Sequence, residues 1–442
     1  MRSDPQAALD RAALAALIDD DRDNARFRVN RRVFIDDAVL ALERIRIFER
    51  CWLYLGHESE VATPGSYVTR DIAGRPIVLS RDPEGQLHAF YNTCSHRGAF
   101  VCRERSGVQR VFHCPYHGWT FDIRGRLTSI PGAESMPPDV NRDGSLDLPR
   151  VEQMESFRGF VFLCFDPQAQ PLVDYLAGAA DYLAYVADHG PQGMEIVGGT
   201  QEYSARANYK MLAENSADGY HGMTTHSTYF DYLRRRDGTV VKRPPGGMGW
   251  VKDLGNGHVV SESVGEMAWG RPYARWVPGW GEDCRQEVSQ IAEEIYARLG
   301  RERGDIVVRG DRNMVIFPNL VINDIMAVTV RTFQPTVAGQ MQINAWALAP
   351  IGESESSRDR RMRNFVEFLG PAGFATPDDV EMLESAQRGY QASASSRAAW
   401  NDCSRGMRKA NPTKTDELQL RTYWRRWRQL MTEGPLDQLQ GP

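Results

Sequence analysis

The segments TCSHRGAF (93–100) and HCPYHGWT (113–120) decide the fold of the N-terminal part of this chain. They supply four side chains that bind metals through sulfur or nitrogen: Cys94, His96, Cys114 and His117. Two Cys/His pairs in short, hairpin-like loops can hold a structural zinc ion or an iron–sulfur cluster. The spacing therefore predicts a metal site built from two neighbouring loops.

Three features favour the cluster over zinc. Each pair combines one thiolate with one imidazole, so one iron can take both cysteines and the other iron both histidines. Gly98, Gly118 and Pro115 allow the loops to fold tightly over a bulky cofactor, and Trp119 provides an apolar cover that limits water. A zinc finger more often pairs cysteine with cysteine and histidine with histidine. We therefore expect a [2Fe–2S] cluster, with structural zinc as the alternative.

The sequence around these loops has the character of strands. Glycine, proline and aspartate punctuate short β-branched and aromatic runs, a pattern typical of hairpins. The runs are PIVLSRD (76–82), LHAFYNT (87–93), RVFHC (110–114), WTFDIRG (119–125) and GFVFLCFD (159–166). They predict an all-β domain over residues 45–166.

The character changes after residue 170, where helical and strand patterns alternate. Helical periodicity covers 171–188, 283–301, 356–369 and 377–392, and the strand-like runs lie within 197–209, 319–333 and 339–350. This mixture predicts an α+β fold over residues 167–442, with helices packed on an antiparallel sheet.

Three further segments are assigned from their composition. We interpret residues 1–44 as an N-terminal helical segment of the same α+β domain. Residues 235–275 are rich in glycine, proline and charge, which favours a long loop or lid. The run RTYWRRWRQLM (421–431) predicts an amphipathic helix with Trp424 and Trp427 packed inward.

Composition bounds the possible partners and the compartment. The chain has 442 residues and a net charge of -5, so no nucleic-acid partner is expected. No apolar run approaches the roughly 18 residues of a membrane span, and the acidic N-terminus does not resemble a signal peptide. Seven cysteines are too few and too scattered for a disulfide framework. We therefore expect a cytoplasmic protein with reduced thiols and no membrane contact.

A second set of metal-binding side chains follows in ARANYKMLAENSADGYHGMTTH (205–226). It contains Asn215, Asp218, His221 and His226. Two histidines and one carboxylate with open positions are the signature of non-haem Fe(II) centres that activate oxygen. His221 and His226 are about 140° apart on an ideal helix, so they do not share a face. A helix broken near Gly219 or Gly222 would allow both to converge.

The first motif resembles that of Rieske proteins, and more particularly that of the aromatic ring-hydroxylating oxygenases. In respiratory Rieske proteins each loop carries an additional cysteine, and the two form a disulfide. Here Ala99 and Tyr116 stand in those places, so the resemblance points to the lower-potential oxygenase type. The likeness runs from about residue 30 to 430 and includes the second motif.

The resemblance also assigns roles around the second motif. It implies that Asp218 is not a metal ligand but bridges His221 to a Rieske histidine of a neighbouring subunit. Asn215 would lie beside the iron.

The third iron ligand comes, by resemblance, from GPAGFATPDDVEMLESAQRGY (370–390), in which Asp379 matches the family's carboxylate. Asp378 and Glu381 are the next candidates. The residues alone also fit a simple helix start, with Thr376 as N-cap and Pro377 in the first turn. Capping and ligation are compatible, because a side chain in the first turn is held rigidly.

The family implies an architecture and an activity. The fold would be a Rieske domain inserted into a helix-grip-like catalytic domain, and the subunits would form a homotrimer or an α3β3 assembly with a small β subunit. Electrons from NAD(P)H would arrive through a reductase, with or without a ferredoxin. The α subunit would use them with O2 to convert an aromatic substrate into a cis-dihydrodiol.

Among the subgroups, the sequence is most similar to dioxygenases for benzoate, toluate or cumate. The segments FPNLVINDIMAVTVRTFQP and AAWNDCSRG carry much of that likeness. The pocket positions inferred from the family are Asn215, Ser216, Gly222, Leu369 and Ala375. Because Gly222 and Ala375 are small, a para substituent or a larger ring is hypothesised to fit. Arg331 and Lys210 are the candidate partners of a substrate carboxylate, with solvated or salt-bridged roles as the alternative.

Three other functions compete with this interpretation. A Rieske monooxygenase, such as an O-demethylase or a salicylate-type hydroxylase, would use the same metals. A pure Rieske electron carrier would be shorter and would lack the second iron site. A binding or structural protein with a vestigial cluster would leave that iron site empty.

Overall fold

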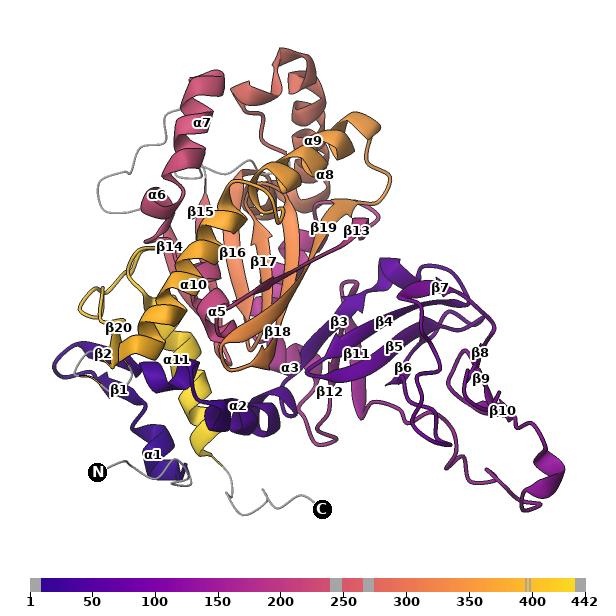
Figure 1. Ribbon diagram of the computed structural model, residues 1–442. Coiled ribbons are helices and arrows are strands. Elements are labelled where there is room, and N and C mark those ends of the chain that lie inside the picture. Colours follow the sequence, from indigo (N-terminus) through magenta and orange to yellow (C-terminus); the bar gives the residue numbers. More distant parts are fainter. Residues whose placement is uncertain (1–8, 239–248, 265–273, 394–395, 397–398, 434–442) are drawn as a thin grey trace. The chain divides into compact units, whose positions relative to one another are not determined.

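The computed structural model describes residues 9–238, 249–264, 274–393, 396 and 399–433 (Figure 1). The chain divides into two compact units, one of residues 49–172 and the other of residues 1–48 with 173–442. In sequence, the first unit is therefore an insertion in the second. Among the described residues, no helix has both the length and the apolar character that a membrane crossing requires.

The unit of residues 49–172 is built from three small antiparallel sheets. Their strand orders are β6-β5-β4-β7, β11-β12-β3 and β10-β9-β8. The bounds are β3 (Leu53–His57), β4 (Ser66–Ile72), β5 (Arg75–Arg81), β6 (Leu87–Tyr91), β7 (Ser106–Val108), β8 (Val111–His113), β9 (Thr120–Asp122), β10 (Leu127–Ser129), β11 (Gln153–Phe157) and β12 (Phe160–Cys164). Each predicted strand run contains one of them, so the all-β prediction is confirmed.

The core of this unit lies directly beneath the two loops that carry the cysteines. Phe90, Phe112 and Phe121 are fully buried there, and the partly buried Ala99 packs against the same cluster. The short strands β8 and β9 each bury their central residue, as expected for strands that cover one face of a core. The two loops therefore pack directly on the hydrophobic core of this unit.

The larger unit is organised around a seven-stranded antiparallel sheet of order β13-β19-β18-β17-β16-β15-β14. The strands are β13 (Met194–Ala205), β14 (Trp250–Gly255), β15 (His258–Val264), β16 (Gly310–Ile316), β17 (Leu320–Asp324), β18 (Val328–Val337) and β19 (Gln340–Pro350). The central strands are buried on both faces, which requires helices on both sides. The predicted α+β class is confirmed.

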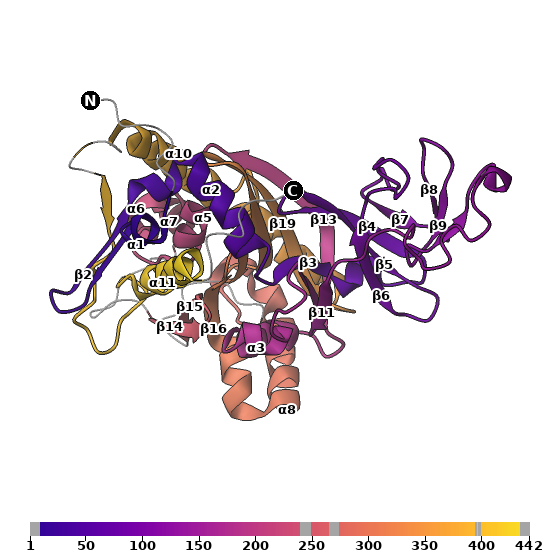
Figure 2. The ribbon, with the colours of Figure 1, turned by 90° about the horizontal axis from the view of Figure 1, so that it is seen from below.

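Helices cover this sheet from the two sides. Figure 2 shows α10 (Ala375–Ser393) and α8 (Arg285–Arg309) on opposite sides of β15 and β16. Further α-helices are α3 (Leu172–Leu176), α4 (Ala179–Ala187), α5 (Tyr209–Ala217), α6 (Gly222–Thr225), α7 (Ser227–Asp237) and α9 (Glu355–Phe368). The layer that contains α5 and α10 is the one that carries the second predicted metal site.

The C-terminal helix α11 (Leu418–Thr432) has the predicted orientation. Trp424 and Trp427 are fully buried. Their indole N–H groups donate to Glu214 and Glu43, at 2.5 and 2.6 Å. A tryptophan can be buried completely in this way because its one polar atom finds an acceptor.

Two expectations about secondary structure are wrong in part. Residues 1–44 include α1 (Arg11–Ala15) and α2 (Asp37–Glu43), but also β1 (Ile18–Asp21) and β2 (Arg26–Asn30). These strands form a three-stranded sheet with β20 (Trp400–Asp402). The alternation in RFRVN buries Phe27 and Val29, a period of two that fits a strand and not a helix.

The second partial error concerns the loop expected over 235–275. The described part of that range contains β14 and β15, which extend the large sheet to its edge. The rest, residues 239–248 and 265–273, lies outside the described residues. The sequence of this segment has no clear strand pattern, and its sheet structure depends on pairing with β16. In sequence, β16 follows only after the long helix α8.

Candidate metal centres and substrate pocket

The two cysteine-bearing loops close by the same hydrogen bonds. Cys94 N–H donates to the carbonyl of Ala99 and Gly98 N–H to that of Cys94, both at 2.8 Å. In the second loop, Cys114 N–H donates to Trp119 at 2.8 Å and Gly118 N–H to Cys114 at 3.0 Å. Both glycines have φ near +75°, a conformation that side chains disfavour. The glycines predicted to allow tight folding are therefore required by the backbone.

The four side chains converge at the ends of these loops. The His96 and His117 rings lie with centroids 4.5 Å apart. The His96 ring also stacks on Trp119, at 4.7 Å and an interplanar angle of 4°. The Nδ1 atom of His117 is buried without a hydrogen-bond partner, as expected of an atom that would ligate a metal. Two imidazoles and two thiols gathered in this way fit a [2Fe–2S] cluster.

The thiols of this site are buried. Burial raises the pKa of the Cys94 thiol, and the neighbouring Cys114 raises it further. Cysteine binds a metal as the thiolate, so a buried thiol of this kind loses its proton when the metal binds. Cluster binding and proton release are therefore linked.

The second site begins where α5 ends. Asn208 caps the start of α5 by accepting a hydrogen bond from Lys210 N–H, and the helix stops at Ala217, after which Asp218 is extended. At Gly219 the chain passes against the backbone of Lys414, where a Cβ would lie 2.7 Å from the Cβ of Lys414. The predicted break near Gly219 is confirmed, and both histidines follow it, His221 directly before α6 and His226 directly after it.

His221, His226 and Asp379 meet after this break. One ligand atom of each lies within 4.8 Å of the others. The Nε2 atoms of both histidines are 3.4 Å from Asp379 Oδ1. Asn215 Nδ2 donates to the same carboxylate oxygen at 3.1 Å. Two imidazoles and a carboxylate converging on one point are the donor set that suits Fe(II).

Asp218 orients the first of these histidines. Its Oδ2 lies 3.0 Å from His221 Nδ1, which directs the Nδ1 proton to the carboxylate and leaves Nε2 facing Asp379. Burial lowers the pKa of His221, but the hydrogen bonds to Asp218 and Asp379 outweigh it and raise the pKa to about 10. Burial raises the pKa of Asp379. The interactions with His221 and His226 lower it by more, so the pKa of Asp379 falls below its usual range. Metal binding here therefore displaces a proton.

Asp379 lies just past the first turn of α10, and the expected cap is wrong. The helix begins at Ala375, and Thr376 Oγ1 donates instead to the carbonyl of Leu369 at 3.0 Å. Of the two other acidic candidates, Asp378 accepts from Thr228 at 3.3 Å, and the exposed Glu381 pairs with Arg388.

A cavity opens beside the three convergent ligands. Its empty volume, which includes space open to solvent, is about 730 Å³. It is lined by all five predicted pocket residues, Asn215, Ser216, Gly222, Leu369 and Ala375. Arg331 also lines it, whereas Lys210 is fully buried elsewhere in an ion pair with Glu43, at 2.9 Å.

Sequence reasoning missed the strand residues of this cavity. Ser261, Asn313 and Asn323 line it from β15, β16 and β17, where they are register partners of one another. Each stands beside another polar residue of its strand, so the sequence contains no distinct signal for it. Their alignment depends on the pairing of three strands, which a single sequence does not reveal.

Comparison with known proteins matches both units. Residues 51–149 match the Rieske [2Fe-2S] domain, and residues 195–433 match the catalytic domain of the ring hydroxylating alpha subunits. The chain is 34% identical to the 2-halobenzoate 1,2-dioxygenase large subunit of Burkholderia cepacia, over 90% of this chain and 83% of the relative. It is 33% identical to the toluate 1,2-dioxygenase subunit alpha of Pseudomonas putida, over 88% and 84%.

The fold is likewise that of a known oxygenase. The structure of naphthalene 1,2-dioxygenase from Rhodococcus sp. superimposes with a TM-score of 0.80 at 26% identity, and covers 92% of this chain and 95% of that one. The family expected from the motifs is thus confirmed. The chain belongs to the ring-hydroxylating dioxygenases, as a terminal oxygenase α subunit that joins a Rieske [2Fe–2S] domain to a catalytic domain of the mononuclear-iron type.

Proposed function

We propose that this α subunit adds both atoms of O2 to the ring of a benzoate-type carboxylate, giving a cis-dihydrodiol. The observation that carries the proposal is the convergence of His221, His226 and Asp379 at the wall of a partly open cavity. Relatives that are a third identical are named for 2-halobenzoate and toluate, which are aromatic carboxylates. A monohydroxylated product would instead indicate the monooxygenase alternative.

In this proposal the two cofactors are bound by separate sets of ligand residues. Cys94, His96, Cys114 and His117 hold the [2Fe–2S] cluster. His221, His226 and Asp379 hold the mononuclear iron, which supplies the oxygen-activating chemistry when bound. These three side chains would hold the iron at the wall of the cavity that they help to line.

The chain's own residues keep the iron ligands in place. Asn215 restrains Asp379 by donating to its Oδ1 at 3.1 Å. Asp218 restrains the His221 ring through Nδ1 and holds the proton on the side away from the ligand atom. We propose that Asp218 also bridges His221 to a Rieske histidine of a neighbouring subunit, so that electrons pass from the cluster to the iron site by way of this bridge. Its carboxylate is only half-buried, so it remains accessible to a partner.

The cavity suggests how a substituted ring is accommodated. A Cβ built on Gly222 meets no atom within 4 Å, so this side of the cavity has spare room. Ala375 contributes a second small side chain. We propose that a para substituent or a larger ring occupies this space.

The remaining components follow from the family. We propose a homotrimer or an α3β3 complex that works in the cytoplasm and receives electrons from an NAD(P)H-dependent reductase, directly or through a ferredoxin. The domain limits of this working unit are proposed as residues 45–166 for the Rieske domain and 167–442, with 1–44, for the catalytic domain. Neither nucleic acid nor a membrane takes part.

Two measurements test the proposal. Purified protein should contain about three irons and about two acid-labile sulfides per chain, because a cluster and one further iron are both present. After reconstitution with a reductase and a panel of aromatic acids, the product should be a cis-dihydrodiol. Two irons per chain would contradict the catalytic assignment and leave an electron carrier. Products formed only from neutral arenes would contradict the substrate class.

A further inference from the structure

Arg331 is a buried cation in the cavity wall. It lies on β18, is 2% exposed, and lines the same cavity as His226 and Asp379. Its Nη2 donates to Asn323 Oδ1 at 2.8 Å and to Ser216 Oγ at 3.4 Å. Its Nε is buried and has no hydrogen-bond partner. The guanidinium thus retains donors that the protein does not satisfy.

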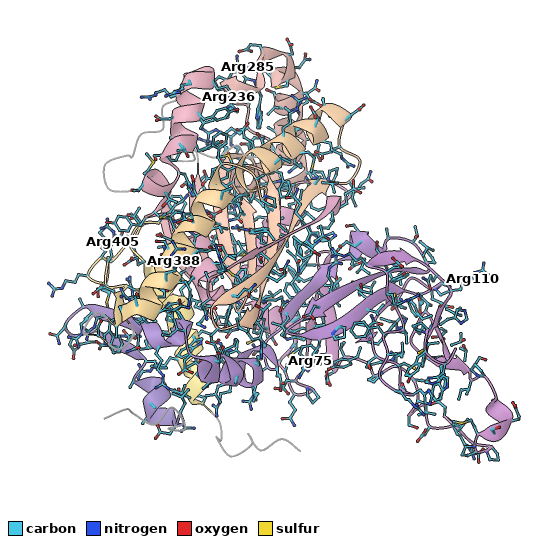
Figure 3. The ribbon with its side chains drawn as sticks, viewed as in Figure 1. Arg75, Arg110, Arg236, Arg285, Arg388 and Arg405 are labelled. Carbon is cyan, nitrogen blue, oxygen red and sulfur yellow. The ribbon has the colours of Figure 1, made fainter. Side chains whose placement is uncertain are left out.

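No carboxylate neutralises this guanidinium among the described residues; its hydrogen-bond partners there are an amide and a hydroxyl. Several other arginines of the catalytic unit have acidic partners. Buried Arg312 lies 3.1 Å from Asp324. Three of the arginines labelled in Figure 3 also have acidic partners: Arg236 with Glu367, Arg285 with Glu282 and Arg388 with Glu381. A buried charge without a counterion is costly, so its retention in a cavity points to an anionic ligand.

The other charges of the cavity are already engaged. Lys414 pairs with Asp311 at 3.0 Å, and Asp379 is held by Asn215 and the two histidines. Among the described lining residues, Arg331 is therefore the cation that has no carboxylate partner and whose charge a ligand can neutralise.

A row of polar residues fixes the orientation of Arg331. Asn323 Nδ2 donates to Asn313 Oδ1 at 2.7 Å, so its Oδ1 is turned towards Arg331. Ser261 pairs with Asn313 on the next strand, and its Oγ is buried without a partner. These side chains form a polar floor beneath the cavity, with donors still available at both Arg331 and Ser261.

The remaining walls are apolar. They are formed by Met223, Phe230, Ile325, Phe368, Leu369 and Ala375. A cavity with an unneutralised cation on its sheet side and apolar walls above it matches a ligand with one anionic group on a flat hydrophobic body. An aromatic ring bearing one carboxylate has this form.

We propose that Arg331 binds the carboxylate of the aromatic substrate, with Ser261 as a second donor, and so selects acids and positions the ring beside the iron ligands. The inference rests on the proposed function, because it takes an aromatic carboxylate as the substrate. It adds the residue that recognises that group. Charge-assisted hydrogen bonds in a buried site are strong enough to set this preference.

The test measures binding, not turnover. Titration calorimetry of the iron-loaded oxygenase with benzoate and with benzamide compares an anion with a neutral molecule of the same shape. The native protein should bind benzoate at least about 100-fold more tightly. Arg331→Met should weaken benzoate binding about 100-fold and leave benzamide binding almost unchanged. Arg388→Met, which removes the same charge from the exposed face of α10, should bind benzoate normally.

The iron and sulfide content of each variant shows whether its two metal sites are intact. Arg331→Gln is a second variant, in which the side-chain amide can still donate a hydrogen bond to Asn323. Benzoate binding at native affinity by either intact variant overturns the assignment of Arg331, even if the enzyme does oxidise aromatic acids. Equal binding of benzoate and benzamide by the native protein overturns it as well. By contrast, a native enzyme that oxidises neutral arenes and no acid refutes the proposed function itself.

Discussion

The cluster loops and the iron-ligand site differ in how their side chains are brought together. Cys94 and Cys114 lie in loops that close by their own hydrogen bonds, each within six residues. His221 and Asp379 come from separate helices and meet only when α5, α6 and α10 pack on the large sheet. The first site is specified by local turn chemistry, while the second is a property of the whole catalytic unit. Substitutions should therefore act locally in the one and through the fold in the other.

The largest effect is expected from Asp379→Ala. Because the three ligands come together only in the folded catalytic unit, loss of one should release the mononuclear iron and leave the cluster loops untouched. Iron should fall from about three to about two per chain, the visible absorption of the cluster should persist, and turnover should become undetectable. Metal analysis and absorption spectra check this. Asp378→Ala is the matched control and should keep its iron; iron retained by Asp379→Ala would mean that another carboxylate is the ligand.

A smaller effect is expected from Asp218→Asn. The substitution keeps the size of the side chain but removes the charge that orients His221 through Nδ1. Turnover should fall about 10- to 100-fold with the cluster still reducible, as is usual for residues that support a metal ligand. Stopped-flow reduction of the cluster, followed by single-turnover measurement of product, separates the two steps. Product formation at the native rate would show that Asp218 has no part in the reaction.

Acid should weaken the catalytic unit through His258. This ring is fully buried, accepts from Phe317 N–H at Nδ1, and faces the Tyr175 carbonyl with Nε2. Burial lowers its pKa to about 4. At pH 7 the ring is neutral in the folded and unfolded states, so it adds no pH dependence there. Below about pH 6.5 only the unfolded chain takes up the proton, and stability falls until about pH 4.

The total loss from this histidine is about 3 kcal/mol, at about 1.4 kcal/mol per pH unit. Denaturant unfolding at pH 7, 6 and 5 measures it. In His258→Asn, the new side chain keeps an acceptor near the Nδ1 position but is smaller and cannot take up a proton. The stability of the variant should therefore be lower at pH 7 and should fall less steeply with acid. An unchanged slope would assign the acid sensitivity to other groups, such as His57 in the Rieske unit, whose burial likewise lowers its pKa to about 4.

The smallest effect is expected from Gly222→Ala. The added methyl group enters open space in the cavity, so the fold and the iron content should not change. The ratio of kcat/KM for 4-methylbenzoate to that for benzoate should fall by up to about 10-fold, the effect of one methyl group in an apolar pocket. Steady-state kinetics on both acids provide the measurement. A constant ratio would show that the para position points elsewhere.

The contrast between the two sites also explains what could be predicted from sequence. Cys94, His96, Cys114 and His117 follow from spacing and turn residues alone. The pair His221 and His226 could be proposed only with a broken helix, which Gly219 provides.

The sequence around Asp379 does not by itself predict a metal ligand, because acidic residues are equally typical of an ordinary helix start. It was identified by family resemblance. Strands β1 and β2 form a local hairpin that was missed, and the second partner of β2, β20, is far away in sequence. The polar floor of Ser261, Asn313 and Asn323 required the register of three strands, which only the assembled sheet defines.

The close approach of Gly219 to Lys414 has an evolutionary consequence. Gly219 N–H donates to the Lys414 carbonyl at 3.1 Å, and the Lys414 side chain is anchored in turn to Asp311 on β16. The backbone that presents His221, a proposed iron ligand, thus packs against the segment around Lys414. In a lineage of such oxygenases, a larger residue at 219 should be tolerated only with a compensating change around 414, so these two segments are expected to diverge as a pair.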